Sequence, residues 1–171
     1  AFYLTAQPRI YGYKASDSVY LNGMDERKNS LEAGLAFSLK KEKAFLDIML
    51  LTDILHENSA WIAQTEVGYD FKLGKLQLYP SLLVTYQSAA FSDYYYGVKS
   101  TETTATRAQY SAQSGLQLGV QTYIKYPLTD KLSTLINLHA EKLSSEATAS
   151  PLVEDDYIYS GLVSLIYTFE Y

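Results

Sequence analysis

Apolar and polar residues alternate along eight stretches of this chain, each about ten to thirteen residues long. In residues 31–39 the odd positions are Leu, Ala, Leu, Phe and Leu, whereas the even positions are Glu, Gly, Ala and Ser. Because successive side chains of a β-strand point to opposite faces, each stretch predicts a strand with one apolar and one polar face. The other stretches are residues 2–13, 44–54, 61–71, 76–86, 116–126, 132–141 and 157–171.

Alternation alone also fits a soluble lipocalin-like barrel, whose apolar side chains point inward. Strand length favours a membrane, because soluble strands most often have about five or six residues, whereas a tilted strand needs about nine to eleven to cross a bilayer. The connections after the second, fourth and sixth strands are tight (residues 40–43, 72–75 and 127–131), and those after the first, fifth and seventh are long and polar. Short turns at one rim and long loops at the other are typical of outer-membrane barrels. We therefore predict an all-β protein, a transmembrane antiparallel up-and-down β-barrel, with residues 1–171 as a single domain.

The composition narrows this prediction. The chain has 17 tyrosines, many near predicted strand ends, where rings with one polar end form the aromatic girdles of membrane barrels. A hydrophobic fraction of 47% with 19% charged residues excludes a disordered chain, and the absence of cysteine excludes thiol catalysis and disulfides. The net charge of −5, without a basic block, argues against nucleic acid as a partner. Because the chain begins directly in a strand, we expect that a signal peptide has been removed or that the chain is part of a longer one.

The polar faces of the predicted strands would line the inside of the barrel. An eight-stranded barrel is just wide enough for interior side chains to fill it, so a packed, hydrogen-bonded plug is the favoured interpretation and a narrow pore is the alternative. Acidic residues outnumber basic ones in this set, so a pore would favour cations. The predicted interior polar residues are Arg9, Glu32, Asp47, Gln64, Glu66, Asp70, Gln117, Gln121, His139 and Glu141.

No residue pattern predicts catalysis, a cofactor or a metal site. His56 follows the third strand and lies near Asp53 and Glu57 in sequence, so that the histidine and a carboxylate resemble an acid–base pair. His139 lies on the polar face of the seventh strand. The sequence places no nucleophile beside either histidine. We interpret His56 as a solvated loop residue and His139 as a member of a polar network. Acidic side chains of the long loops could share Ca²⁺ or Mg²⁺, but a solvated charged surface is the favoured interpretation.

Two further sets of residues are candidates for contact with other molecules. Lysines in the tight turns could bind an acidic partner or the cell wall, although lysine is also common in exposed hairpin turns without any such role. These lysines are Lys40, Lys41, Lys43, Lys72, Lys75 and Lys131. The alternating aromatic residues Tyr167, Phe169 and Tyr171 at the carboxyl end resemble the terminal strand that the barrel assembly machinery recognises.

Three segments carry a resemblance to a known family. They are residues 23–35 (GMDERKNSLEAGL), 92–98 (SDYYYGV) and 150–153 (SPLV), and the most specific is the predicted loop with Asp93, Tyr94, Tyr95, Tyr96 and Gly97. Together they resemble the MltA-interacting protein (MipA/OmpV) family of Gram-negative outer-membrane proteins. Family members are longer at the amino terminus, which implies ten to twelve strands in the family-length protein and missing amino-terminal strands in this chain.

The resemblance implies a role rather than a reaction. It implies a non-enzymatic scaffold that links a lytic transglycosylase and a penicillin-binding protein in peptidoglycan synthesis, with a narrow porin-like channel or an adhesin as the alternative. We also expect contact with outer-membrane lipid and lipopolysaccharide, and the pattern of long loops and tight turns predicts extracellular long loops and periplasmic termini. Whether Tyr94, Tyr95 and Tyr96 form an exposed recognition patch or fold back over the barrel mouth stays open.

Overall fold

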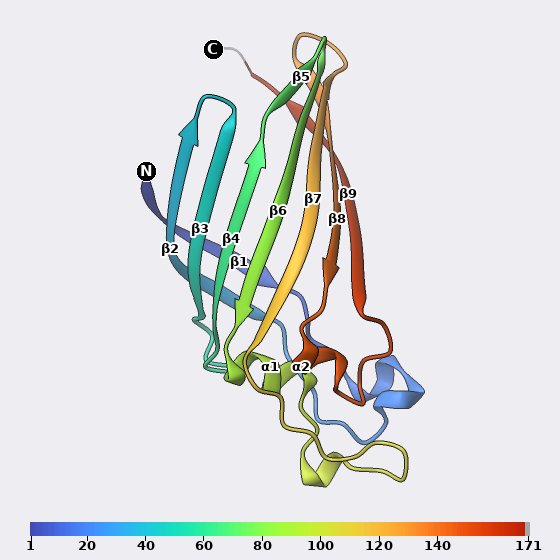
Figure 1. Cartoon of the computed structure of the whole chain (residues 1–171). Helices are drawn as coiled ribbons and strands as arrows, with labels where there is room; N and C mark the ends of the chain where they lie inside the picture. Colours follow the sequence, from blue (N-terminus) through green and yellow to red (C-terminus); the bar gives the residue numbers. More distant parts are fainter. Residues whose placement is uncertain (170–171) are drawn as a thin grey trace.

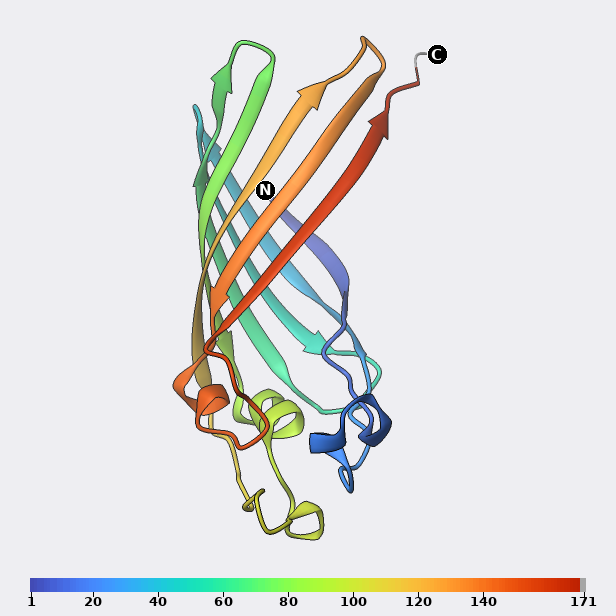
Figure 2. The ribbon, with the colours of Figure 1, turned by 90° about the vertical axis from the view of Figure 1, so that its right-hand side faces the viewer.

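One antiparallel sheet forms most of the computed structural model, which describes residues 1–169. Neighbouring strands follow the order β1-β2-β3-β4-β6-β7-β8-β9, and the short β5 pairs with β6. The sheet curls into a half-barrel (Figures 1 and 2), and within residues 1–169 its open edges are β1 and β9. The strands are β1 (Phe2–Arg9), β2 (Ser30–Lys41), β3 (Ala44–Asp53), β4 (Trp61–Tyr69), β5 (Phe71–Leu73), β6 (Leu76–Gln87), β7 (Gly115–Pro127), β8 (Leu132–Lys142) and β9 (Tyr157–Tyr167).

The two ends of the sheet differ as the sequence predicts. Tight turns connect β2 to β3, β5 to β6 and β7 to β8 at one end, which we call the tight-turn end. The connections of residues 10–29, 88–114 and 143–156 lie at the other, long-loop end, where they form what we call the loop cap. The loop cap contains the 3-10 helices η1 (Ala15–Asp17), η2 (Val19–Leu21) and η3 (Ser100–Glu102) and the α-helices α1 (Ala89–Tyr96) and α2 (Ser145–Thr148).

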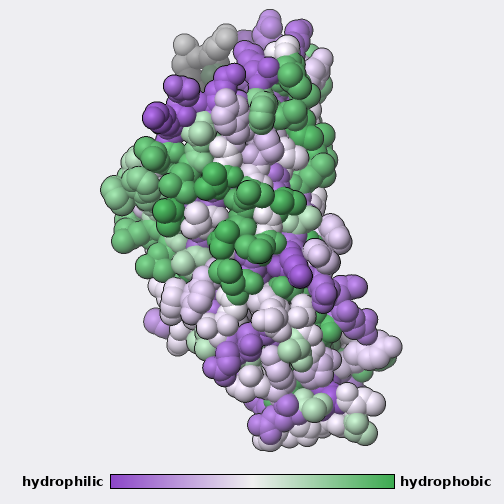
Figure 3. Space-filling view, viewed as in Figure 1, coloured by the Kyte–Doolittle hydropathy of each residue, from purple (hydrophilic) through white to green (hydrophobic). Residues whose placement is uncertain are grey.

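Apolar side chains cover the convex face of the sheet, and polar ones line the concave face. Leu35 and Leu118 are 61% and 55% exposed, whereas Glu32 and Gln117, each on the opposite face of the same strand, are 3% and 1% exposed. Figure 3 shows a hydrophobic band over the sheet, with polar surface beyond it at both ends. This arrangement is the reverse of a soluble barrel and confirms the predicted membrane-barrel class. Among residues 1–169, no helix has the length and apolar character needed to cross a membrane.

Aromatic pairs mark both ends of the apolar face. Toward the long-loop end, the ring of Trp61 lies 5.1 Å from that of Tyr86 between centroids, and Tyr157 stacks with Tyr159 at 6.2 Å. Toward the tight-turn end, the ring of Phe2 on β1 contacts that of Phe37 on β2. Rings two positions apart in sequence are in contact in the pairs Tyr69–Phe71 and Tyr167–Phe169. Rings in these positions suit the two interfaces of a bilayer, where an apolar body meets a polar boundary.

Some predicted strand boundaries are wrong. The first strand ends at Arg9 rather than near residue 13, because Tyr11 leaves the sheet to contact the rings of Phe91 and Tyr95 in the loop cap. The predicted strand 61–71 breaks at Asp70, whose carboxylate pairs with Lys40 at 3.5 Å. The eight predicted strands are thus the continuous path of the sheet, and β5 is additional.

Candidate functional site

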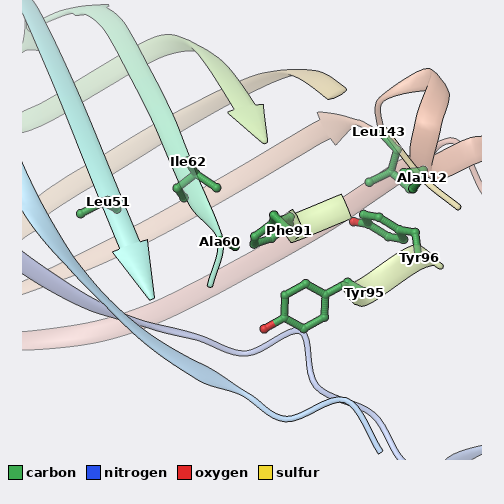
Figure 4. Close-up of a cluster of buried hydrophobic side chains, with 9 residues drawn as sticks. Leu51, Ala60, Ile62, Phe91, Tyr95, Tyr96, Ala112 and Leu143 are labelled. Carbon is green, nitrogen blue, oxygen red and sulfur yellow. The ribbon is translucent and has the colours of Figure 1, made fainter. Parts of the chain in front are cut away.

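Helix α1 closes the concave side at the long-loop end. Its N-cap is Ser88, whose hydroxyl accepts hydrogen bonds from the backbone N–H groups of Phe91 and Trp61. Phe91 and Tyr95, one helical turn apart, are 1% and 2% exposed. Figure 4 shows the ring of Phe91 beside Ala60, and Phe91 and Tyr95 belong with Leu51 and Ile62 to one buried apolar cluster. The cluster fixes the helix across the mouth of the half-barrel.

The tyrosine motif belongs to this helix, so the predicted loop at residues 93–97 is largely helical. Tyr95 and Tyr96 are buried, and Tyr94 is half-buried. The hydroxyl of Tyr94 accepts a hydrogen bond from the Lys28 backbone N–H at 2.9 Å, and that of Tyr95 donates to the Lys28 carbonyl at 3.2 Å. Asp93 accepts a hydrogen bond from the Ala112 N–H at 3.0 Å, and Gly97 N–H donates to the Asp93 carbonyl. The rings therefore fold back over the barrel mouth.

A buried ion pair joins two loops of the cap. The Arg27 guanidinium donates to both carboxylate oxygens of Glu102 at 2.9 Å each, and the two side chains are 4% and 0% exposed. Glu102 also accepts hydrogen bonds from the backbone N–H groups of Asp25 and Lys99. Arg27 donates in addition to the Tyr94 carbonyl at 2.7 Å, next to the tyrosine motif. We call the pair Arg27–Glu102 the latch.

The hydrogen bonds of the latch determine the charge state of Glu102. Burial alone would raise the pKa of its carboxyl group, but hydrogen bonds from Arg27 and from the Lys99 and Asp25 N–H groups outweigh burial and lower the pKa to about 2. Arg107, which is 5% exposed, adds a second bond between loops by donating to the carbonyls of Tyr20 and Glu102. The loop cap is thus held by buried charged groups with full partners.

The concave face carries two polar networks among the predicted interior residues. Arg9 donates to both oxygens of Glu32, with Nη2 and Oε2 2.9 Å apart, and its guanidinium lies over the Tyr11 ring. Glu66 accepts hydrogen bonds from Ser81 at 2.6 Å and from Gln121 at 2.7 Å, and this second network continues to Asn137.

The other predicted interior residues are not all joined to these networks. Gln117 accepts a hydrogen bond from Gln87 at 3.0 Å. Asp47 faces Glu66 across the β3–β4 ladder, and Gln64 on β4 is half-buried. Glu141 is 7% exposed and interacts electrostatically with Arg9 on the far edge strand. Asp70 lies between β4 and β5 and not in a strand.

The two histidines occupy different surroundings. His56 is exposed, in a left-handed backbone conformation with φ of 58°, and Asp53 instead accepts hydrogen bonds from the N–H groups of Leu55 and Asn58. His139 Nδ1 lies 3.4 Å from the Ser160 hydroxyl on the neighbouring strand. Within residues 1–169, no group of three or more metal-ligating side chains has a geometry that could hold an ion.

The six predicted turn lysines differ in their structural roles. Lys40 and Lys41 lie within β2, and Lys40 is paired with Asp70, so the β2–β3 turn itself is Glu42 and Lys43. Lys72 lies within β5, while Lys75 and Lys131 lie in turns as predicted. In the carboxyl-terminal segment, Tyr167 ends β9 and its ring contacts Phe169; Tyr171 lies outside the described residues.

Sequence reasoning missed the residues that organise the loop cap. Arg27 and Glu102 are 75 positions apart, and in sequence each is an ordinary loop charge. Helix α1 did leave a signal, because a serine N-cap precedes Phe91 and Tyr95 at helical spacing. The sequence also gives no sign that Lys72 and Lys125 line one cleft at the tight-turn end.

An antiparallel half-barrel with an apolar convex face, aromatic pairs at both ends and a polar concave face defines an outer-membrane β-barrel protein. Comparison with known sequences gives the family. The profile described as MltA-interacting protein MipA matches residues 2–169, and the chain belongs to this family.

Curated relatives agree with this assignment. The chain is 30% identical to outer membrane protein Omp26La of Vibrio anguillarum over 152 residues, covering 89% of this chain and 58% of that protein. It is 29% identical to outer membrane protein OmpV of Vibrio cholerae, with the same two coverages. It is 25% identical to the MltA-interacting protein of Escherichia coli, covering 96% of this chain and 66% of that protein. The chain thus spans less than two thirds of the length of these relatives. No solved structure matches it significantly.

Proposed function

We propose that this protein is a non-enzymatic scaffold of the outer membrane that acts in murein synthesis and remodelling. The observation that carries the proposal is the contrast between the two ends of the half-barrel. The loop cap is closed by α1 and the latch, whereas the tight-turn end presents Lys41 and Lys43, which are exposed and form no ion pair among residues 1–169. One relative is named for its interaction with MltA, and the other two relatives described above are named as outer membrane proteins.

The proposed orientation follows the pattern of outer-membrane barrels, with long loops outside and tight turns and termini in the periplasm. In this orientation the loop cap contacts lipopolysaccharide. Lys41 and Lys43 then face the periplasm, where a lytic transglycosylase or a penicillin-binding protein could bind them through acidic surfaces. Both lysines are exposed, and neither forms an ion pair within the described part of the chain.

A porin-like channel is the second candidate, because the concave face is lined by polar side chains such as Glu66 and Gln121. Against it, Phe91 and Tyr95 fill the mouth at the long-loop end. We therefore expect no steady conductance from the full-length protein in planar bilayers. Reproducible cation-selective channels would instead favour the channel.

Reversal of the lysine charges tests the scaffold role. We expect the double variant Lys41→Glu/Lys43→Glu to lose co-purification with a lytic transglycosylase, because both side chains are solvated and their replacement leaves the fold intact. The matched control is Lys14→Glu/Lys142→Glu, which changes the net charge equally but alters exposed lysines at the long-loop end. Undiminished partner capture by the first variant, with the barrel folded as judged by its gel shift on heating, would refute this contact.

A further inference from the structure

A cleft at the tight-turn end gathers lysines from two hairpins. It has a volume of about 340 Å³ and lies between the β5–β6 and β7–β8 hairpins. Its polar lining comes from Lys72, Lys75, Gln77, Lys125 and Ser133 and includes no acidic side chain. We call it the lysine cleft. Its volume is at the lower end of the range of ligand pockets, which suits a small ligand.

Strand register explains why these side chains converge. Lys72 on β5 lies directly opposite Gln77 on β6, and Gln77 lies directly opposite Lys125 on β7. The three residues therefore form one row across three strands, with the two lysines about 10 Å apart at their Cα atoms, twice the spacing between strands. Side chains opposite each other in a ladder share a face, and this row continues the concave face that carries Gln121.

Among residues 1–169, no acidic side chain forms an ion pair with the lysines of the cleft, Lys72, Lys75 and Lys125. Lys40, nearby in the fold, is paired with Asp70. Lys125 is half-buried, and the turn that carries Lys75 is fixed by Gly74, whose φ of 60° favours glycine. A cleft lined by one sign of charge concentrates its field and attracts counter-ions of the opposite sign.

We propose that the lysine cleft binds a phosphate group. Three ammonium groups can each donate to phosphate oxygens, and lysine is a common phosphate ligand. The Gln77 amide and the Ser133 hydroxyl add neutral donors on the same lining. Because the row belongs to the concave face, a free phosphate ester or diphosphate reaches the cleft more directly than a lipid headgroup on the convex side. The inference is independent of the proposed scaffold role, which concerns Lys41 and Lys43.

Binding of pyrophosphate by the purified full-length protein tests the inference. We expect saturable binding in zwitterionic detergent, measured by titration calorimetry, that weakens as salt is raised. The triple variant Lys72→Gln/Lys75→Gln/Lys125→Gln should bind pyrophosphate about tenfold more weakly or worse. Each substitution removes a hydrogen bond from a charged donor to the phosphate, and such bonds contribute strongly to affinity. The matched control Lys41→Gln/Lys43→Gln/Lys142→Gln removes the same charge elsewhere and should bind within about twofold of the native protein. No saturable binding, or equal losses in the two variants, would overturn the proposal.

A measurement on the unmodified sequence keeps the test valid if the triple variant does not fold. Lysine acetylation read by mass spectrometry should show pyrophosphate protecting Lys72, Lys75 and Lys125 but not Lys41. A second sample in bilayer discs containing phosphatidylglycerol identifies the source of the phosphate. Protection by pyrophosphate alone assigns a free anion, and protection by the lipid as well assigns a headgroup; both support the site. Equal protection of Lys41, or protection of none of these lysines, would refute it.

Discussion

At the residue scale, the latch between Arg27 and Glu102 is the interaction on which the loop cap depends most. Both partners are almost completely buried, and every oxygen of the carboxylate accepts hydrogen bonds. Burying two charges is costly, so such a pair contributes less to net stability than its geometry suggests. Loss of one partner is a different matter, because it leaves the other charge buried without compensation.

We therefore expect Glu102→Ala to destabilise the loop cap by about 3 to 5 kcal/mol. The control Lys99→Ala breaks the exposed pair between Lys99 and Asp25, whose side chains are both 62% exposed, and should cost about 0 to 1 kcal/mol. Hydrogen exchange of residues 94–107 in the detergent-solubilised protein measures both effects. Similar exchange in the two variants would show that the latch does not hold the cap.

The pKa of Glu102 also predicts how the cap responds to acid. Because the pKa is lowered from 4.5 to about 2 in the folded protein, the latch contributes its full stability above pH 4.5. That contribution, on the order of 3 kcal/mol, is lost progressively as the pH falls from 4.5 to 2. The loss can be followed by measuring the protease resistance of the loop cap as a function of pH. Glu102→Gln should abolish this dependence, and an unchanged pH profile in that variant would contradict the assignment.

At the scale of the element, the alternation of apolar and polar residues predicts the strands of this chain, but it does not predict helix α1. In β2 the exposed Leu35 and the buried Glu32 are separated by the period of two that their sequence shows. Helix α1 lies in a long, polar connection that the sequence predicts as a loop. Its N-cap Ser88 and the spacing of Phe91 and Tyr95 could have identified it.

The remaining contacts depend on how distant segments meet. The latch joins residues 75 positions apart, and the lysine cleft needs the register that sets Lys72 and Lys125 on either side of Gln77. Local propensity carries no information about such pairs. A single sequence therefore predicts which residues share a face of a strand, but not which distant residues pair with the charged residues of the loops.

The facing of the strands predicts how single charges are tolerated. Leu35→Arg places a charge on the apolar face in the middle of β2 and should cost about 2 to 4 kcal/mol near the bilayer midplane. Gln64→Arg, in the middle of β4 on the concave face, should cost less because the side chain stays among polar groups. Gln117 is a poorer control than Gln64, since it is 1% exposed and bonded to Gln87. Urea unfolding in lipid vesicles compares the variants, and equal costs would argue for a soluble barrel.

At the scale of the whole molecule, the half-barrel has two open edges, β1 and β9, within residues 1–169. Unpaired strand edges cannot stay exposed in the hydrocarbon core, because their N–H and C=O groups find no water there. The chain spans 58% to 66% of the length of the relatives named above. We propose that further strands of a family-length protein, ten to twelve in all, pair these edges and close the barrel.

The orientation of the barrel in the membrane can be tested with inserted protease cleavage sites. The loop cap offers a suitable position at residues 103–106, which are all exposed between the buried Glu102 and Arg107. A site-specific protease added to intact cells should cut a recognition sequence inserted after Ala105, because this end carries the long loops that face outward in outer-membrane barrels. The same sequence inserted after Gly74, in a tight turn, should be cut only once the outer membrane is permeabilised. Cleavage of the Gly74 insertion alone on intact cells would reverse the topology, and the lysine cleft would then open toward the exterior.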